Sequence, residues 1–267
     1  MKVLIITVNE TALLLPMWEK IITSRKNDRF FLLVMHHPWI RKSKSTSRKK
    51  IERYCSSVIL YVLHYGLKNT LRKILEHILT IFGCNSSRAN RKYAQMCLRH
   101  GIEFSTVKPF CRDELFALIK RHAPDIILHQ APIRLDEELL YLPARGIISR
   151  HPSLLPQYKG CFPVFWAFLR KEKEFGVTIH RVEKKYDSGQ ILAQMAFKAG
   201  EKESLADVYR RTYEAGADLF IKTLDTLSKT TIVMPVMPKY ESSYFGWPSL
   251  PTLIKFVLSA RYCKRNA

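Results

Sequence analysis

The first half of the chain alternates short apolar runs with stretches of helical periodicity. The apolar runs lie at residues 2–8, 30–35, 102–107 and 125–130. Each run has the length of a buried strand, and residues 11–24 and 111–123 space their apolar side chains as amphipathic helices do. Strands that are apolar on both faces and alternate with helices are typical of a parallel sheet covered on two sides. We therefore predict an α/β fold, with a Rossmann-like, mostly parallel sheet flanked by helices.

The second half of the chain continues this alternation and ends in helices. The predicted elements are a short helix at 136–142, a strand at 146–149, a helix at 162–171, and strands at 176–183 and 190–197. Ser204 begins a long helix, because Asp207 three residues later completes a pair that resembles a capping box. We divide the chain into an α/β domain of residues 1–200 and a carboxyl-terminal helical extension of residues 201–267.

Positive charge is in excess and unevenly distributed. Of the 267 residues, 44 are Lys or Arg and 23 are Asp or Glu, which gives a net charge of +21. Residues 37–100 hold fourteen of the basic residues against two acidic ones, so more than half of the excess lies in a quarter of the chain. This balance favours an anionic partner: a phosphorylated substrate, an acidic membrane surface or nucleic acid.

Other features of the composition narrow the class of protein. The six cysteines are scattered without a C-x-x-C pair, which argues against a disulfide framework and a zinc site and for a reducing compartment. The start, MKVLIITV, is too short an apolar run for a signal peptide, and no run approaches the ~18 apolar residues of a membrane span. We therefore expect a cytoplasmic protein without a metal site.

A histidine follows the predicted strand at 146–149, in the loop sequence HPSLLPQYKG. Sites in doubly wound sheets form at the carboxyl ends of strands, where His151 emerges. Asp187 lies in the D-S-G turn of HRVEKKYDSGQILAQ, just before another strand. A carboxylate beside a histidine orients the imidazole and raises its basicity, so the two form a candidate acid/base pair. Spacing alone leaves open a structural histidine beside an unrelated turn aspartate.

The turn after the first strand excludes two common nucleotide sites. Its sequence, NETALLLP, contains no glycine, and no G-K-[S/T] motif occurs in the chain. The dinucleotide fingerprint and the phosphate-binding loop both require glycines, because the backbone must approach the phosphates closely. This turn therefore binds something other than a pyrophosphate.

The histidine and aspartate motifs together resemble the catalytic core of the 10-formyltetrahydrofolate-dependent formyltransferases. HPSLLPQYKG is followed by CFPVFW, GVTIH and YDSGQILAQ in the order and spacing of that family, closely so over residues 124–194. The family includes glycinamide ribonucleotide, methionyl-tRNA and amino-sugar formyltransferases. The resemblance implies formyl transfer from 10-formyltetrahydrofolate, a co-substrate, to a primary amine. We expect an amino sugar or a lipid-linked amine.

The resemblance assigns the catalytic positions, with one departure. His151, tuned by Asp187, would manage the proton and stabilise the developing oxyanion. The family has an asparagine two residues before the histidine, and this chain has Ser149. A serine hydroxyl also donates, but losing one oxyanion donor typically costs ~10²–10³ in rate. Two alternatives to a transferase therefore stay open: a hydrolase that releases formate, and a weak or inactive relative.

The resemblance also implies which residues contact the folate. They lie before the histidine strand, in the S-L-L-P run and before the aspartate: Ile133, Arg134, Leu135, Ser153, Leu154, Leu155, Pro156, Glu183, Lys184, Lys185 and Tyr186. Ordinary core packing is the alternative for the leucines. In sugar-type members an arginine follows the motif glycine, whereas this chain has Cys161, which leaves the contact to an acceptor phosphate unassigned.

Relative to a compact member of the family, residues 41–83 look inserted. They begin with the basic, aperiodic sequence RKSKSTSRKK, for which we predict a loop. Residues 58–82 then predict a basic amphipathic helix, with Leu60, Leu63, Leu67, Leu71, Ile74 and Ile78 on one face and Lys68, Arg72, Lys73 and His77 on the other. Three roles stay open: packing on the core, peripheral contact with an anionic membrane, and contact with a partner chain.

One feature of the sequence favours methionyl-tRNA as the acceptor, and another argues against it. The basic sequence at 41–50 is suited to a phosphate backbone. Only about seventy residues follow Gln194, and the long helix uses many of them, which leaves no room for the additional β-barrel of those enzymes. We therefore expect no nucleic acid partner, and the sequence does not set the oligomeric state.

Overall fold

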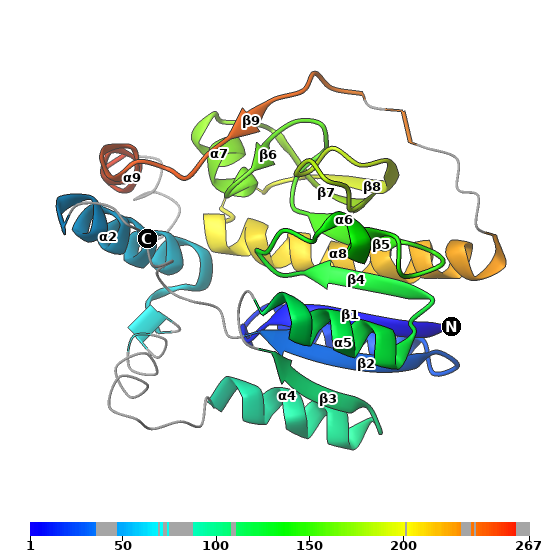
Figure 1. The fold of residues 1–267 in the computed structure, drawn as a ribbon. Coiled ribbons are helices and arrows are strands. Elements are labelled where there is room, and N and C mark those ends of the chain that lie inside the picture. The colour runs from blue at the N-terminus through cyan, green and yellow to red at the C-terminus, as the bar shows by residue number, and fades with distance from the viewer. Residues whose placement is uncertain are drawn as a thin grey trace.

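The computed structural model describes residues 1–35, 47–68, 70–71, 74, 88–107, 111–200, 202–230, 236–237 and 239–259. Its centre is a seven-stranded sheet of order β3-β2-β1-β4-β5-β7-β8 (Figure 1). The strands are β1 (Lys2–Val8), β2 (Arg29–Met35), β3 (Glu103–Val107), β4 (Ile126–Gln130), β5 (Ile147–His151), β7 (Glu174–Arg181) and β8 (Ile191–Lys198). The first five are parallel, and β7 and β8 are each antiparallel to the preceding strand in the sheet order. The prediction of a mostly parallel sheet is confirmed.

Helices cover both faces of this sheet (Figure 1). They are α1 (Leu14–Ser24), α2 (Ser47–Tyr65), α4 (Arg88–Arg99), α5 (Arg112–His122), α6 (Glu137–Leu140), α7 (Pro163–Leu169), α8 (Leu205–Lys229) and α9 (Leu250–Val257). Helices α1 and α8 pack together on one face, where the ring of Trp18 lies 5.9 Å from that of Phe220 and its Nε1 donates to Thr7. Helix α5 packs on the opposite face, where His122 contacts Phe31.

Helix α8 joins the carboxyl-terminal region to the main core. Ser204 caps this helix in a capping box with Asp207, as predicted. Phe220 and Leu224 are fully buried in the same hydrophobic cluster as the central strands. Helix α8, which follows the predicted boundary at residue 200, therefore buries its apolar face against the sheet.

The inserted segment differs from the single amphipathic helix that the sequence predicts. Helix α2 begins at Ser47, within the predicted loop, and ends at Tyr65. Gly66 has φ +80°, a conformation that ends a helix and that glycine adopts without strain. Residues 41–46, 69, 72–73 and 75–83 lie outside the described part of the chain, and with them Arg72, Lys73, His77 and Ile78 of the predicted helix.

The two halves of the predicted leucine face have different surroundings. Leu60 and Leu63 are buried in a second cluster, together with side chains of α7, α8 and α9. Leu67 is 62% exposed and Leu71 is 56% exposed. Leu60 and Leu63 are therefore part of the core, and Leu67 and Leu71 lie on the surface.

The carboxyl-terminal tail reaches back to the loop that holds the histidine motif. Strand β9 (Tyr244–Phe245) pairs with the two-residue strand β6 (Lys159–Gly160), and α9 packs against α2 (Figure 1). The helical tail is thus confirmed for α9, and residues 260–267 lie outside the described residues. This tail connects the inserted helix to the loop after β5.

Candidate active site

A cavity of about 530 Å³ opens at the carboxyl ends of the parallel strands. The segments after β1, β4 and β5 line it, together with the turn between β7 and β8 and side chains of α2 and α8. The three predicted catalytic residues, Ser149, His151 and Asp187, all line this cavity. Within the part of the chain that the structure describes, no group of three or more His, Cys, Asp and Glu residues is arranged to hold a metal ion.

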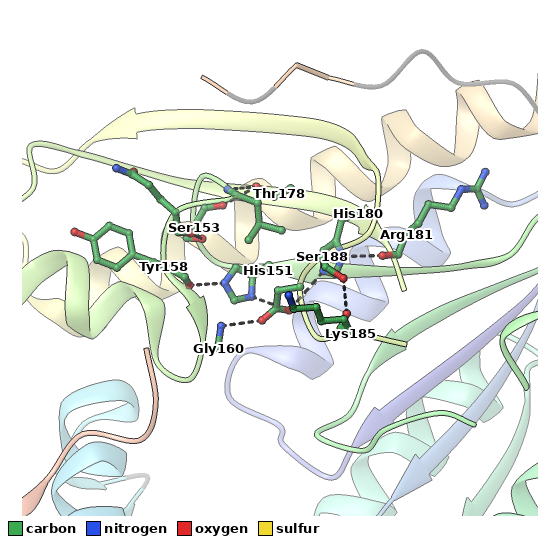
Figure 2. A network of polar contacts seen from close by, with 12 residues as sticks. His151, Ser153, Tyr158, Gly160, Thr178, His180, Arg181, Lys185 and Ser188 are labelled. Atoms are coloured by element: carbon green, nitrogen blue, oxygen red, sulfur yellow. Dashed lines mark hydrogen bonds and ion pairs between the residues drawn. The ribbon is translucent and has the colours of Figure 1, made fainter. Parts of the chain in front are cut away.

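His151 lies between a carbonyl oxygen and a carboxylate (Figure 2). Its Nε2 is 2.8 Å from the carbonyl oxygen of Tyr158. Because a carbonyl only accepts hydrogen bonds, we assign the proton of the neutral ring to Nε2. Its Nδ1 is 3.5 Å from Oδ1 of Asp187. Nδ1 is therefore the atom that can accept a proton, and Asp187 is placed to stabilise the resulting imidazolium.

Burial keeps His151 neutral. Removal from water lowers the pKa of its imidazole from the ordinary value of 6.5, and this effect exceeds the opposing effects of Asp187 and the Tyr158 carbonyl. The positive charges of Arg150 and Lys159 lower the pKa further. A neutral imidazole at physiological pH is in the protonation state that a general base requires.

The backbone of the next loop holds Asp187 in position. Its Oδ2 accepts a hydrogen bond from the N–H of Gly160 at 2.8 Å. Gly160 has φ +93°, and a Cβ there would lie 2.2 Å from the carbonyl oxygen of Phe245 in β9. Only glycine fits this position, because β6 and β9 approach so closely. The pairing of these short strands therefore places the amide that orients the aspartate.

Two histidines of neighbouring strands flank Ser149. The register places His129 of β4 and His180 of β7 beside it, on the same face of the sheet. Burial is the main cause that lowers the pKa of each of these histidines to about 4, so both are neutral. Nε2 of His129 is buried, has no hydrogen-bond partner among the described residues, and belongs to a side chain that lines the cavity. A ligand oxygen at this point would satisfy it.

His180 extends the same polar cluster toward Asp187. Its Nδ1 donates to the carbonyl oxygen of Arg181 at 2.8 Å, and its Nε2 lies 3.9 Å from Oδ1 of Asp187 (Figure 2). The GVTIH segment carries the family resemblance through its spacing, which by itself predicts no role for its histidine. The period-two alternation of β7 was the available signal, because Thr178 and His180 share the face that pairs with His151 and Ser149.

Most of the predicted folate-binding residues line the cavity. They are Ile133, Arg134, Leu135, Glu183, Lys184, Lys185 and Tyr186. Arg134 joins the two segments, because its guanidinium donates to the carbonyl oxygen of Lys184 at 2.7 Å. The same group lies 5.6 Å from the ring centre of Tyr186. The structure brings these seven residues together as one wall.

The S-L-L-P run does not form part of that wall. Ser153, Leu154 and Leu155 are buried, and neither they nor Pro156 lines the cavity. The hydroxyl of Thr178 donates to the carbonyl oxygen of Ser153 and accepts from the N–H of Leu155, so this loop turns toward β7. That these four residues contact the folate stays a prediction. Their packing supports the loop that carries His151.

The inserted segment supplies side chains that the sequence analysis did not assign to the site. Tyr61, His64 and Tyr65 of α2 all line the cavity. Their i, i+3 and i+4 spacing places them on one face of the helix, a signal that the leucine periodicity of the same segment obscured. Helix α2 is therefore a wall of the site.

The carboxylate of Glu10 binds backbone N–H groups in the turn after β1. Glu10 accepts hydrogen bonds from the N–H groups of Ala12, Leu13 and Leu14, at 3.0 Å for Leu13 and 2.8 Å for Leu14. These are the groups through which the start of a helix binds anions. Because Glu10 occupies them, they are not available to a pyrophosphate.

The fold and the site define a Rossmann-like α/β protein with a histidine–aspartate pair at the carboxyl edge of its sheet. The sequence profile of the family described as formyl transferase matches residues 81–224, more than half of the chain. The chain therefore belongs to the formyl transferase family. This confirms the resemblance carried by the two motifs.

Two curated relatives show how the family varies. The bifunctional polymyxin resistance protein ArnA of Wigglesworthia glossinidia brevipalpis is 39% identical over 111 residues, which are 42% of this chain and 17% of that protein. The methionyl-tRNA formyltransferase of Alkaliphilus metalliredigens is 32% identical over 151 residues, 56% of this chain and 48% of that enzyme. The matched region spans less than half the length of either relative.

A solved structure confirms the fold. The sugar N-formyltransferase from Shewanella sp FDAARGOS_354 superposes with a TM-score of 0.55 over 92% of this chain and 77% of that one, at 17% identity. Its name and that of the methionyl-tRNA enzyme give different acceptors. Membership of the family therefore leaves the acceptor to be inferred from this chain's own residues.

Proposed function

We propose that this chain transfers a formyl group from 10-formyltetrahydrofolate to a primary amine, either an amino sugar or a lipid-linked amine. The observation that carries the proposal is the neutral His151 beside Asp187, in a cavity lined by seven of the residues that the family resemblance assigns to the folate. Membership of the formyl transferase family supports the same reaction.

The proposed reaction forms a C–N bond and breaks another. The acceptor nitrogen attacks the formyl carbon, and its proton passes to Nδ1 of His151, which faces Asp187 at 3.5 Å. The tetrahedral intermediate then breaks its bond to N10 of tetrahydrofolate, which takes the proton from Nδ1 of His151 as it leaves, so the imidazole returns to its neutral form. Asp187 stabilises the transient imidazolium, and the carbonyl oxygen of Tyr158 keeps the ring oriented throughout.

The oxyanion of the intermediate needs a hydrogen-bond donor on the same side of the sheet. Ser149 lies two residues before His151 on that face and lines the cavity. His129 lies beside it, with a buried Nε2 that has no partner among the described residues. A hydroxyl and a neutral imidazole both donate, so the two together take the place of the family's asparagine amide.

Release of tetrahydrofolate tests the proposal. The purified chain is incubated with 10-formyltetrahydrofolate, alone and with a panel of amines that includes amino sugars. We expect release that depends on an amine and a formylated amine as the second product. Release without an amine, together with formate, would instead establish the hydrolase. No release with any amine would show an inactive relative and overturn the proposal.

The substitution Ser149→Asn tests the departure from the family pattern. An asparagine amide reaches further than a serine hydroxyl, so we expect kcat to rise, by up to about 10²-fold if the serine is a poor oxyanion donor. Steady-state kinetics measure the change, with Ser24→Asn, at an exposed serine at the end of α1, as the matched control. An unchanged or lower kcat would contradict this expectation and show a site rebuilt around Ser149 and His129.

We further propose that the surface beyond Gly66 contacts anionic membranes. Leu67 and Leu71 are exposed there, beside the exposed Lys68. A lysine near acidic lipid contributes roughly 1 kcal/mol, and exposed leucines add burial in the interface. No described helix has the length and apolar character to cross a membrane, so the contact would be peripheral.

Flotation with phosphatidylserine vesicles measures this contact. We expect the wild type to float, and less so at 0.5 M salt than at 0.1 M, because the Debye length falls below about 10 Å. The double substitution Leu67→Gln, Leu71→Gln should abolish flotation. Leu98→Gln, at an exposed leucine of α4, is the matched control. A wild type that stays at the bottom of the gradient at low salt would refute the contact.

A further inference from the structure

The cavity has a second half, on the face of the sheet opposite His151. Side chains alternate along β5, so Arg150 points away from Ser149 and His151, toward α8. We name this half the tyrosine compartment, which consists of Arg150 with Tyr61, His64 and Tyr65 of α2 and Tyr209 and Tyr213 of α8. All six residues line the cavity. The inserted helix thus forms one side of the compartment.

Arg150 is a buried cation without a carboxylate partner. Its side chain is 3% exposed, and its Nε has no hydrogen-bond partner among the residues that the structure describes. Nη1 makes a long contact, 3.5 Å to the carbonyl oxygen of Thr212, the guanidinium lies 3.8 Å from the ring centre of Tyr213, and the neutral hydroxyl of Tyr213 accepts a hydrogen bond from it. No ion pair joins Arg150 to any acidic residue in the described ranges. An unpaired buried charge is costly, so proteins retain one where a ligand compensates it.

The surrounding tyrosine and histidine side chains carry no negative charge that would compensate the positive charge of Arg150. Burial raises the pKa values of Tyr61, Tyr65 and Tyr213 above the ordinary value of 10, so the phenols stay neutral. Burial, with the nearby Arg150, lowers the pKa of His64 to about 3, so its imidazole is neutral too. The compartment therefore carries one positive charge at physiological pH, among neutral hydroxyl groups.

Glu10, whose charge acts on the tyrosines of the compartment, is already engaged. Both carboxylate oxygens of Glu10 accept hydrogen bonds from backbone N–H groups at the start of α1. Its negative charge is therefore stabilised by the positive end of that helix. This leaves the guanidinium of Arg150 as the charged group that is available to a ligand in the compartment.

We propose that the tyrosine compartment binds an oxyanion, phosphate or carboxylate, that belongs to the amine acceptor. A guanidinium offers a planar array of N–H donors that suits both groups, and the tyrosine hydroxyls can donate to the remaining oxygens. The compartment and the folate wall lie on different faces of the same cavity, so the amine would be held between its anionic end and the formyl group. Only the identification of the oxyanion as part of the acceptor rests on the proposed function.

Calorimetric titration tests the compartment without formyl transfer. Inorganic pyrophosphate and malonate are titrated separately into the full chain at constant ionic strength, which distinguishes phosphate from carboxylate. Each titration is repeated with saturating 5-formyltetrahydrofolate. We expect at least one of the two anions to bind, with an affinity that the folate leaves unchanged. Displacement by the folate would place the anion in the folate half and overturn the proposal.

Two variants locate the bound anion. Arg150→Met removes the charge at similar side-chain length, and we expect binding to weaken roughly 10- to 100-fold. Gly216→Ala keeps the charge, but its Cβ would lie 2.3 Å from Cδ of Arg150, so the guanidinium must move and binding must weaken. Lys222→Met, at an exposed lysine of α8, is the control for net charge and should bind as the wild type does.

The anion titrations and the tetrahydrofolate-release assay can fail independently of each other. Binding that is equal in the wild type and Arg150→Met would overturn the compartment, as would a wild type that binds neither anion. If Arg150→Met does not fold, Gly216→Ala decides in the same way. A chain that binds the anion through Arg150 but releases no tetrahydrofolate would retain the compartment and contradict only the proposed transfer.

Discussion

His151→Ala is expected to lower kcat for formyl transfer by about 10²–10⁴, the usual contribution of a positioned general base. The substitution removes Nδ1, the proton acceptor of the neutral ring, which faces Asp187 at 3.5 Å and lies closer to it than Nε2 of His180 does at 3.9 Å. Binding of the folate should change little, because the folate wall is formed by other segments. The kinetic measurement is therefore paired with a titration of 5-formyltetrahydrofolate.

The main alternative cause of such a loss is unfolding. His151 is buried, and its loss leaves the carbonyl oxygen of Tyr158 without this donor, at a cost of about 1–3 kcal/mol. Thermal unfolding followed by circular dichroism shows whether the variant is folded at the assay temperature. His100→Ala, at an exposed histidine of the loop after α4, is the matched control. A folded His151→Ala protein with wild-type kcat would exclude this histidine as the base.

The order of strands and helices was predictable because the central strands are buried on both faces. Runs such as residues 2–8 and 125–130 have no polar face, and this pattern is specific for a parallel sheet between two layers of helices. The end of α2 was not predictable from the same kind of pattern, because the leucine spacing continues through Gly66. Only the positive φ of that residue shows where the helix ends.

Some residues of the candidate site were likewise predictable from the sequence, and others were not. His151 and Asp187 were accessible because each stands at a strand end in a motif whose order and spacing are specific. Arg150 carried an equally simple signal, since the residue between Ser149 and His151 must point to the other face of the strand. The neighbours of that side chain depend on tertiary structure. Gly216 of α8 packs against Arg150, and side chains of α2 line the same cavity.

Asp187→Asn is expected to lower kcat by about 10²-fold and to shift its pH dependence. The transfer needs neutral His151, so kcat should be constant at high pH and should fall as the pH drops through the pKa of the imidazole. Burial sets that pKa below 6.5, and Asp187 is the largest influence that raises it. Without the carboxylate charge the pKa falls further, so the acid limb of the profile should move to lower pH.

The direction of this shift separates a role in proton transfer from a role in folding. An asparagine at position 187 still offers an oxygen to the N–H of Gly160, so the loop after β6 should keep its conformation. A variant that merely distorted the loop would lose activity at every pH and leave the acid limb in place. Asp113→Asn, at an exposed aspartate of α5, controls for the loss of one surface charge. An acid limb that moves to higher pH would contradict the assignment, because it would mean that the Asp187 carboxylate opposes the imidazolium instead of stabilising it.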